Sequence, residues 1–224
     1  MVRASPAQPE VPLRRSRPLL LAATLLGLGA CANQEIIEDG GVRVVRSACP
    51  AVAIPAETGD VTLFRQPGAA NASDIDVTAY ITRLRSTCGE NGGQIVSTAT
   101  YEVHGQRPTP GPARDVVLPT FATVIQGGTN IVAKRQSAVR LSFAEGQTRA
   151  STRAQSIGVV DRAAATLPPE TVKQLTRRRR PGDADAALDP LADPAVRSAV
   201  SRASFELLVG FQLTPEQLRY NATR

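Results

Sequence analysis

Three cysteines carry most of the chemistry that this sequence can be expected to perform. Cys31 closes the run Leu28-Gly29-Ala30-Cys31, in which small residues stand directly before the thiol. An uncharged stretch of ten residues, 18–27, precedes this run, and a basic cluster formed by Arg14, Arg15 and Arg17 precedes that stretch. A positive cluster, a short apolar stretch and a small-residue cleavage site are the three parts of a secretory signal peptide.

Leu28-Gly29-Ala30-Cys31 resembles the lipobox of bacterial lipoproteins. The resemblance implies cleavage before Cys31 and attachment of acyl chains such as palmitate to its thiol, with residues 1–30 as signal peptide and 31–48 as a lipidated tether. Ala32 stands where an aspartate retains enterobacterial lipoproteins at the inner membrane, which implies an outer-membrane anchor facing the periplasm. The alternatives are an ordinary secretory signal, a buried helix, or a transmembrane anchor, for which the stretch falls short of about 20 residues.

Cys49 and Cys88 are left for a disulfide bond once Cys31 carries lipid. Because an exported compartment is oxidising, we predict that these two cysteines are joined. Loop entropy gives such a bond roughly 3–4 kcal/mol for a loop of about 40 residues. The alternative is two free buried thiols. No metal or cofactor is expected, because neither cysteine has a Cys or His partner at ligand spacing.

His104 is the only histidine in the sequence and therefore the only imidazole available for acid–base catalysis. A catalytic histidine needs a nucleophile and an orienting acid close by. The sequence contains no Gly-x-Ser-x-Gly motif and no recognisable Cys–His pair. We therefore expect a protein that is not an enzyme, with a hydrolase assembled from dispersed residues near His104 as one alternative.

Four consecutive arginines, Arg177, Arg178, Arg179 and Arg180, form the strongest charge feature. Guanidinium groups bind phosphates and carboxylates, so the run could hold an anionic glycan or lipopolysaccharide. The alternative is a solvated basic helix end, favoured by the helix dipole and neutralised by the acidic segment that begins at Asp183. Residues 1–30 contain four of the 26 basic residues and one of the 20 acidic ones, which leaves a mature net charge of +3. This modest charge and the export signal argue against nucleic acid as a partner.

Alternating apolar and polar residues between 49 and 165 predict the β-strands that would position these side chains. Short glycine-rich turns separate the strands, and no helical pattern lies between them, which favours an antiparallel β-sandwich. A seven-stranded immunoglobulin-like or fibronectin-III-like sandwich is the favoured architecture. In 77–87 we expect Tyr80, Thr82 and Leu84 on one face, and Pro119 should place the first half of its strand at a sheet edge or a bulge. The expected strands are 42–46, 60–64, 77–87, 94–103, 116–125, 130–143 and 147–160.

The pattern becomes helical from residue 166 to residue 224. Pro169, the Asp193-Pro194 pair and Thr214 mark three helix starts, the last as a capping box with Gln217. This predicts a C-terminal helical segment that packs on the β body or docks on a partner. Its second helix is expected to carry an apolar stripe at helical spacing formed by Val196, Ala199, Val200, Ala203, Leu207 and Phe211.

These features favour an envelope lipoprotein that acts as a non-enzymatic structural or interaction module, tethered through Cys31. The expected partners are the membrane, through the lipid anchor, and an envelope protein or an anionic glycan. The first alternative is an anionic-glycan or lipopolysaccharide-binding module that uses Arg177 to Arg180. The second alternative is the hydrolase near His104.

Overall fold

The computed structural model describes residues 47–66, 71–177, 182–184 and 187–223. The expected signal peptide, Cys31 and the expected strand 42–46 lie outside the described residues, as do Arg178, Arg179 and Arg180. All the described residues belong to one compact unit.

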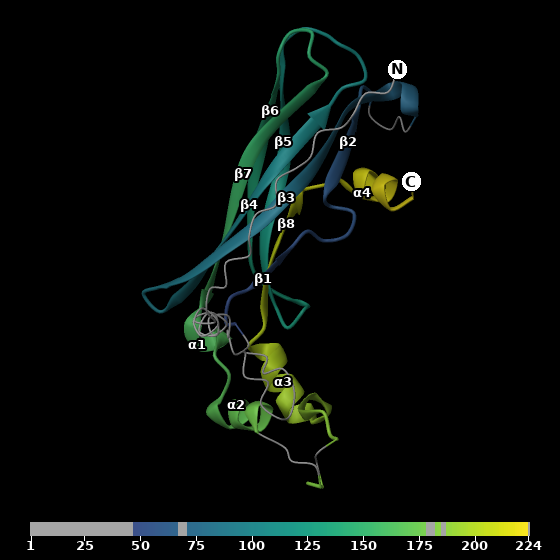
Figure 1. The fold of residues 1–224 in the computed structure, drawn as a ribbon. Helices are drawn as coiled ribbons and strands as arrows, with labels where there is room; N and C mark the ends of the chain where they lie inside the picture. Colours follow the sequence, from purple (N-terminus) through teal and green to yellow (C-terminus); the bar gives the residue numbers. More distant parts are fainter. Residues whose placement is uncertain (1–46, 67–70, 178–181, 185–186, 224) are drawn as a thin grey trace, which may run out of the picture. The chain divides into compact units, whose positions relative to one another are not determined.

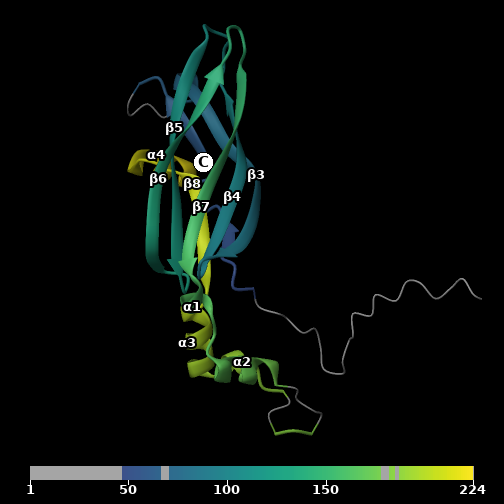
Figure 2. The same ribbon diagram turned by 90° about the vertical axis from the view of Figure 1, so that its left-hand side faces the viewer.

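The described chain is mainly β and forms two four-stranded sheets, as a β-sandwich does. Sheet A has the strand order β1-β8-β5-β6, and sheet B has the order β2-β3-β4-β7. Figures 1 and 2 show the long strands of the two sheets running alongside one another. The strands are β1 (Ala51–Ala53), β2 (Asp60–Phe64), β3 (Ile75–Asn91), β4 (Gln94–Gln106), β5 (Arg114–Gln126), β6 (Asn130–Phe143), β7 (Arg149–Asp161) and β8 (Phe205–Phe211).

The six strands predicted between 60 and 160 are confirmed as β2 to β7, each within a few residues of its expected bounds. The expected edge position of Pro119 is also confirmed. Residues 114–119 of β5 pair with β6 alone, and pairing with β8 starts only at Thr120. Proline lacks the N–H that a second neighbouring strand would need, so it suits this half of the strand.

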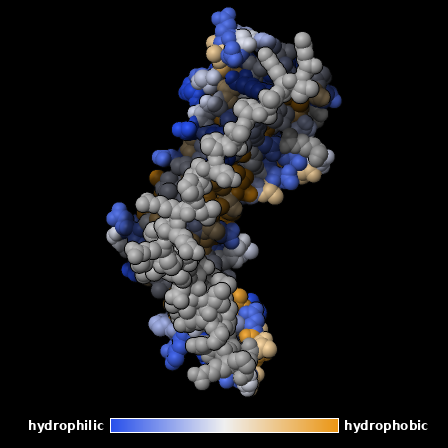
Figure 3. Space-filling view, viewed as in Figure 1, coloured by the Kyte–Doolittle hydropathy of each residue, from blue (hydrophilic) through white to orange (hydrophobic). Residues whose placement is uncertain are grey.

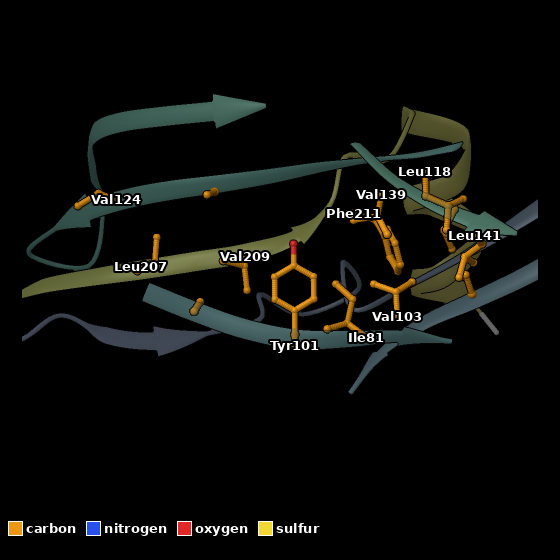
Figure 4. Packing of buried hydrophobic residues seen from close by; sticks show 14 of the residues in the cluster. Ile81, Tyr101, Val103, Leu118, Val124, Val139, Leu141, Leu207, Val209 and Phe211 are labelled. Atoms are coloured by element: carbon orange, nitrogen blue, oxygen red, sulfur yellow. The ribbon is translucent and has the colours of Figure 1, made fainter. Parts of the chain in front are cut away.

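Side chains from both sheets meet in one apolar core. Alternation along β3, β4 and the second half of β6 places Val77, Ile95, Val103 and Leu141 in this core together with Leu207 of β8, all essentially inaccessible to solvent. In Figure 4 the ring of Tyr101 projects from β4 into the space between the sheets. Its hydroxyl lies 3.4 Å from the hydroxyl of Ser156 on β7, so the one polar group of this side chain has a buried partner.

Within the described ranges, four helices and two short 3-10 turns accompany the strands. The three predicted helix starts are confirmed, and two of them have side-chain caps. Asp193 accepts a hydrogen bond from the backbone N–H of Ala195 at 2.8 Å, and Thr214 and Gln217 cap one another reciprocally. The helices are α1 (Arg162–Ala165), α2 (Pro169–Thr176), α3 (Pro194–Arg202) and α4 (Pro215–Thr223), and the 3-10 turns are η1 (Ala72–Asp74) and η2 (Pro190–Ala192).

The expected apolar stripe on one long helix is wrong beyond Arg202. Helix α3 ends there, and Leu207 and Phe211 belong to strand β8 instead. Phe205, Leu207, Val209 and Phe211 are buried at period two. This strand pairs antiparallel with β5 and parallel with β1, so the segment expected to be helical supplies the interior of sheet A. The sandwich therefore has eight described strands rather than seven.

Candidate functional site

The predicted disulfide bond between Cys49 and Cys88 is present. The two sulfur atoms are 2.08 Å apart, and the Cα atoms are 6.1 Å apart. Cys88 lies near the end of β3, directly across from Ser97 of β4. The bond therefore joins the first described residues to sheet B, close to the β3–β4 turn.

The same end of the sandwich carries α1 and the residues that follow α3. The backbone N–H of Arg162, at the start of α1, donates to the carbonyl of Gly93 in the β3–β4 turn at 3.0 Å. After α3, the carbonyl of Ser204 accepts from Gly127 in the β5–β6 turn at 3.0 Å. Arg177 follows the last residue of α2 and is exposed, and it is the one described member of the arginine run.

His104 lies on the outer face of sheet B, in a polar cluster that the sequence did not predict. Its Nε2 atom is 3.3 Å from Oε2 of Glu102, two residues earlier on the same face of β4. Its ring stacks on Tyr80 of β3, with 5.5 Å between the ring centroids and an interplanar angle of 17°. Arg83 of β3 and Arg153 of β7 also reach Glu102, at 3.3 Å and 3.4 Å. One carboxylate thus holds three cationic or potentially cationic groups.

A β-bulge in β3 brings Arg83 to this cluster. Thr82 pairs with Glu102 and Arg85 pairs with Thr100, so two residues of β3 stand opposite the single residue between them. Arg83 is one of those two residues and has a φ of 52°, a left-handed conformation that is rare outside glycine. The bulge reverses the alternation of the strand, as bulges do. Leu84 therefore packs against the core, and its expected position on the face of Tyr80 and Thr82 is wrong.

The cluster keeps Glu102 ionised to lower pH than an ordinary glutamate. Partial desolvation alone would raise the pKa of its carboxyl. The positive charge of Arg83 and the hydrogen bonds from Arg153 and His104 outweigh this effect, so the pKa of Glu102 lies below its ordinary value of 4.5. Since both arginines are largely exposed, solvent weakens these ion pairs.

His104 and Glu102 supply a base and an orienting acid, two of the three groups that a hydrolase of the serine type needs. Ser151 of β7 lies directly across from His104. In the described part of the chain no hydrogen bond joins this serine to the imidazole, and the contacts of His104 are with Glu102 and Tyr80. The hydrolase hypothesis therefore still needs a nucleophile in contact with the histidine.

No group of three or more His, Cys, Asp or Glu side chains in the described ranges is arranged to hold a metal ion. None of the helices formed by the described residues is long and apolar enough to cross a membrane.

Comparison with known proteins gives one structural similarity. No protein-family model matches the chain, and no curated protein matches it. Among solved structures, the chain is similar to a DUF1425 family member from Shewanella sp. pv-4. The two chains are 15% identical over 48% of this chain and 91% of the other, with a TM-score of 0.24.

Proposed function

We propose that this protein is an envelope lipoprotein, anchored through Cys31 to the outer membrane on its periplasmic side, and that it acts as a non-enzymatic interaction module. The observation that supports this proposal is the disulfide bond between Cys49 and Cys88. Structural disulfides persist in oxidising compartments, which are the compartments that an exported lipoprotein reaches. The bond also ties the start of the folded body to β3 of sheet B. Cys49 lies 18 positions after the proposed acylated residue.

The tether length limits how far the body can lie from the membrane. Fully extended, the chain between Cys31 and Cys49 spans at most about 60 Å. The disulfide lies at the end of the sandwich where α1 and the residues after α3 contact the strand turns. The tether therefore joins the folded body at this end of the sandwich.

Labelling cells with an alkyne-bearing fatty acid tests the anchor. The wild-type chain should carry the label and fractionate with outer membranes, whereas Cys31→Ser should carry no label. The matched control is the double variant Cys49→Ser/Cys88→Ser, which removes two other cysteines and should still be labelled. Absence of label from the wild-type chain, or mass spectrometry showing residues 1–30 still attached, would contradict the proposal.

Anion binding by Arg177 to Arg180 is a second candidate function. The observation in its favour is that α1 and the residues after α3, which flank α2 and α3 in the chain, contact the strand turns at the end that carries the disulfide. A basic segment held near a bilayer gains about 1 kcal/mol per arginine from anionic headgroups. Replacing the four arginines with alanine should weaken binding to anionic vesicles and reduce its salt dependence. Unchanged binding would remove this candidate.

The relation to immunoglobulin or fibronectin-III sandwiches stays a hypothesis. Two facing sheets whose strands are joined by short turns support this hypothesis. The strand order differs from that of an immunoglobulin domain. The consecutive strands β2, β3 and β4 share one sheet here, whereas immunoglobulin strands B and C lie in different sheets.

A further inference from the structure

We propose that the outer edge of β6 binds an extended acidic polypeptide segment, which would add a strand to sheet A. This inference gives the proposed interaction module a binding edge. It does not depend on the lipid anchor, because the edge belongs to the folded body. It rests on three observations, namely the position of β6, its burial pattern and its charge.

β6 is the last strand of sheet A, and β5 is its one partner among the described strands. A strand in this position presents a row of backbone N–H and C=O groups that no neighbouring strand satisfies. Such a row binds extended peptides through main-chain hydrogen bonds, and side-chain contacts then select the sequence.

The burial pattern separates β6 into two halves. In the second half Val139, Leu141 and Phe143 alternate with exposed residues, as expected for a strand that covers a core. In the first half every residue from Asn130 to Ala138 is exposed, so both of its faces are open. Ile131 is 62% exposed and Val132 is 46% exposed, which leaves apolar surface beside an open backbone edge.

Charge selects the occupant of this edge. The exposed half contains Lys134 and Arg135 and no acidic residue. Successive residues point to opposite faces of a strand, so an added strand would meet a cation on each face. Opposite charges on neighbouring strands are favourable, and like charges are unfavourable.

The same charges disfavour a second copy of this chain as the occupant. In an antiparallel pairing of two β6 strands centred on the exposed half, each Lys134 would face its own counterpart. Natural edge strands use lysine in this way to prevent self-association. On the face shown in Figure 3, hydrophilic residues predominate toward the upper end of the sandwich, and hydrophobic residues gather near its middle.

A pair of synthetic peptides tests the proposal on the purified full chain in detergent. Both are capped, have the length of Asn130–Ala138 and are built from Val and Thr. One carries two adjacent glutamates at its centre, and the other carries two lysines. The glutamate peptide should bind about tenfold more tightly, which corresponds to two cross-strand ion pairs. The same peptide with alternate backbone amides methylated should lose binding, because it cannot extend the sheet.

Charge reversal identifies the edge. Lys134→Glu/Arg135→Glu should reverse the preference so that the lysine peptide binds more tightly. The control Arg85→Glu/Arg149→Glu reverses two exposed cations of sheet B and should keep the original preference. Urea unfolding checks that both variants are folded. The proposal is overturned if the edge variant still prefers glutamate, if amide methylation has no effect, or if the chain dimerises through β6.

Discussion

The guanidinium of Arg107 lies over the aromatic ring of Phe143, with 5.3 Å between its Cζ atom and the ring centroid. Arg107 is 5% exposed, and its side chain donates hydrogen bonds to backbone carbonyls. These bonds tie the proline-rich loop after β4 to the turn between β6 and β7. The accepting carbonyls belong to Gln147 at 2.7 Å, Gly111 at 2.8 Å, Pro112 at 2.9 Å and Ala144 at 3.2 Å.

Arg107→Ala should lower the free energy of unfolding by about 2–4 kcal/mol, because it removes charge-assisted hydrogen bonds and leaves several carbonyls without a donor. Arg107→Lys should recover only part of this loss, since one ammonium cannot reach carbonyls on both loops. Urea unfolding measures the change. Arg85→Ala, at an exposed site, is the control and should stay within about 0.5 kcal/mol of the wild type. A loss no larger than that of the control would show that Arg107 does not hold the loops.

Reducing the bond between Cys49 and Cys88 should destabilise the folded body by about 4 kcal/mol, because the unfolded chain regains the freedom of a loop of roughly 40 residues. Urea unfolding with and without dithiothreitol measures the difference. The double variant Cys49→Ser/Cys88→Ser should have the stability of the reduced wild type and should not respond to dithiothreitol. If dithiothreitol changed the stability of both proteins equally, the change could not be due to the bond between Cys49 and Cys88.

Glu102→Gln should lower stability at neutral pH and lose this effect in acid. The pKa of Glu102 in the folded protein lies below its ordinary value of 4.5. A lowered carboxyl pKa stabilises the folded state above the ordinary value, and this stabilisation disappears as the pH falls through the lowered pKa. The difference in urea midpoint between wild type and variant should therefore shrink below pH 4.5.

A Glu102→Gln difference that is constant from neutral pH to strong acid would mean that Arg83, Arg153 and His104 do not stabilise the folded state through this carboxylate.

Gly105→Ala should destabilise the sandwich by about 1–3 kcal/mol through overpacking of the core. A Cβ atom at this position of β4 would lie 2.6 Å from Cδ1 of Leu141 and 3.2 Å from the ring of Phe143. Gly89→Ala is the matched control, because a Cβ atom there has no neighbour within 4 Å. Thermal unfolding should separate the two variants, and equal melting temperatures would contradict the close packing at Gly105.

Local sequence determined much of the secondary structure. Six strand predictions and three helix starts are confirmed, because alternation, glycine turns and capping residues act within a few positions of one another. The pairing of Cys49 with Cys88 was predictable for a different reason. Once Cys31 was assigned to lipid, these were the last two cysteines in a chain predicted to reach an oxidising compartment.

Strand β8 shows that the local hydrophobic pattern does not always determine the secondary structure. Leu207 and Phe211 are four residues apart, which fits one face of a helix, yet they also fit one face of a strand with Val209 between them. The open position between β1 and β5 resolves the ambiguity, since both neighbours offer backbone hydrogen bonds that a helix could not use.

The polar cluster and the open edge of β6 were decided by tertiary structure alone. Glu102, His104, Tyr80 and Arg83 come together because strand register sets their neighbours and a one-residue bulge turns Arg83 outward. Neither the strand register nor the position of the bulge can be predicted from a short stretch of sequence. The edge of β6 likewise exists only because the order of strands in sheet A places it last.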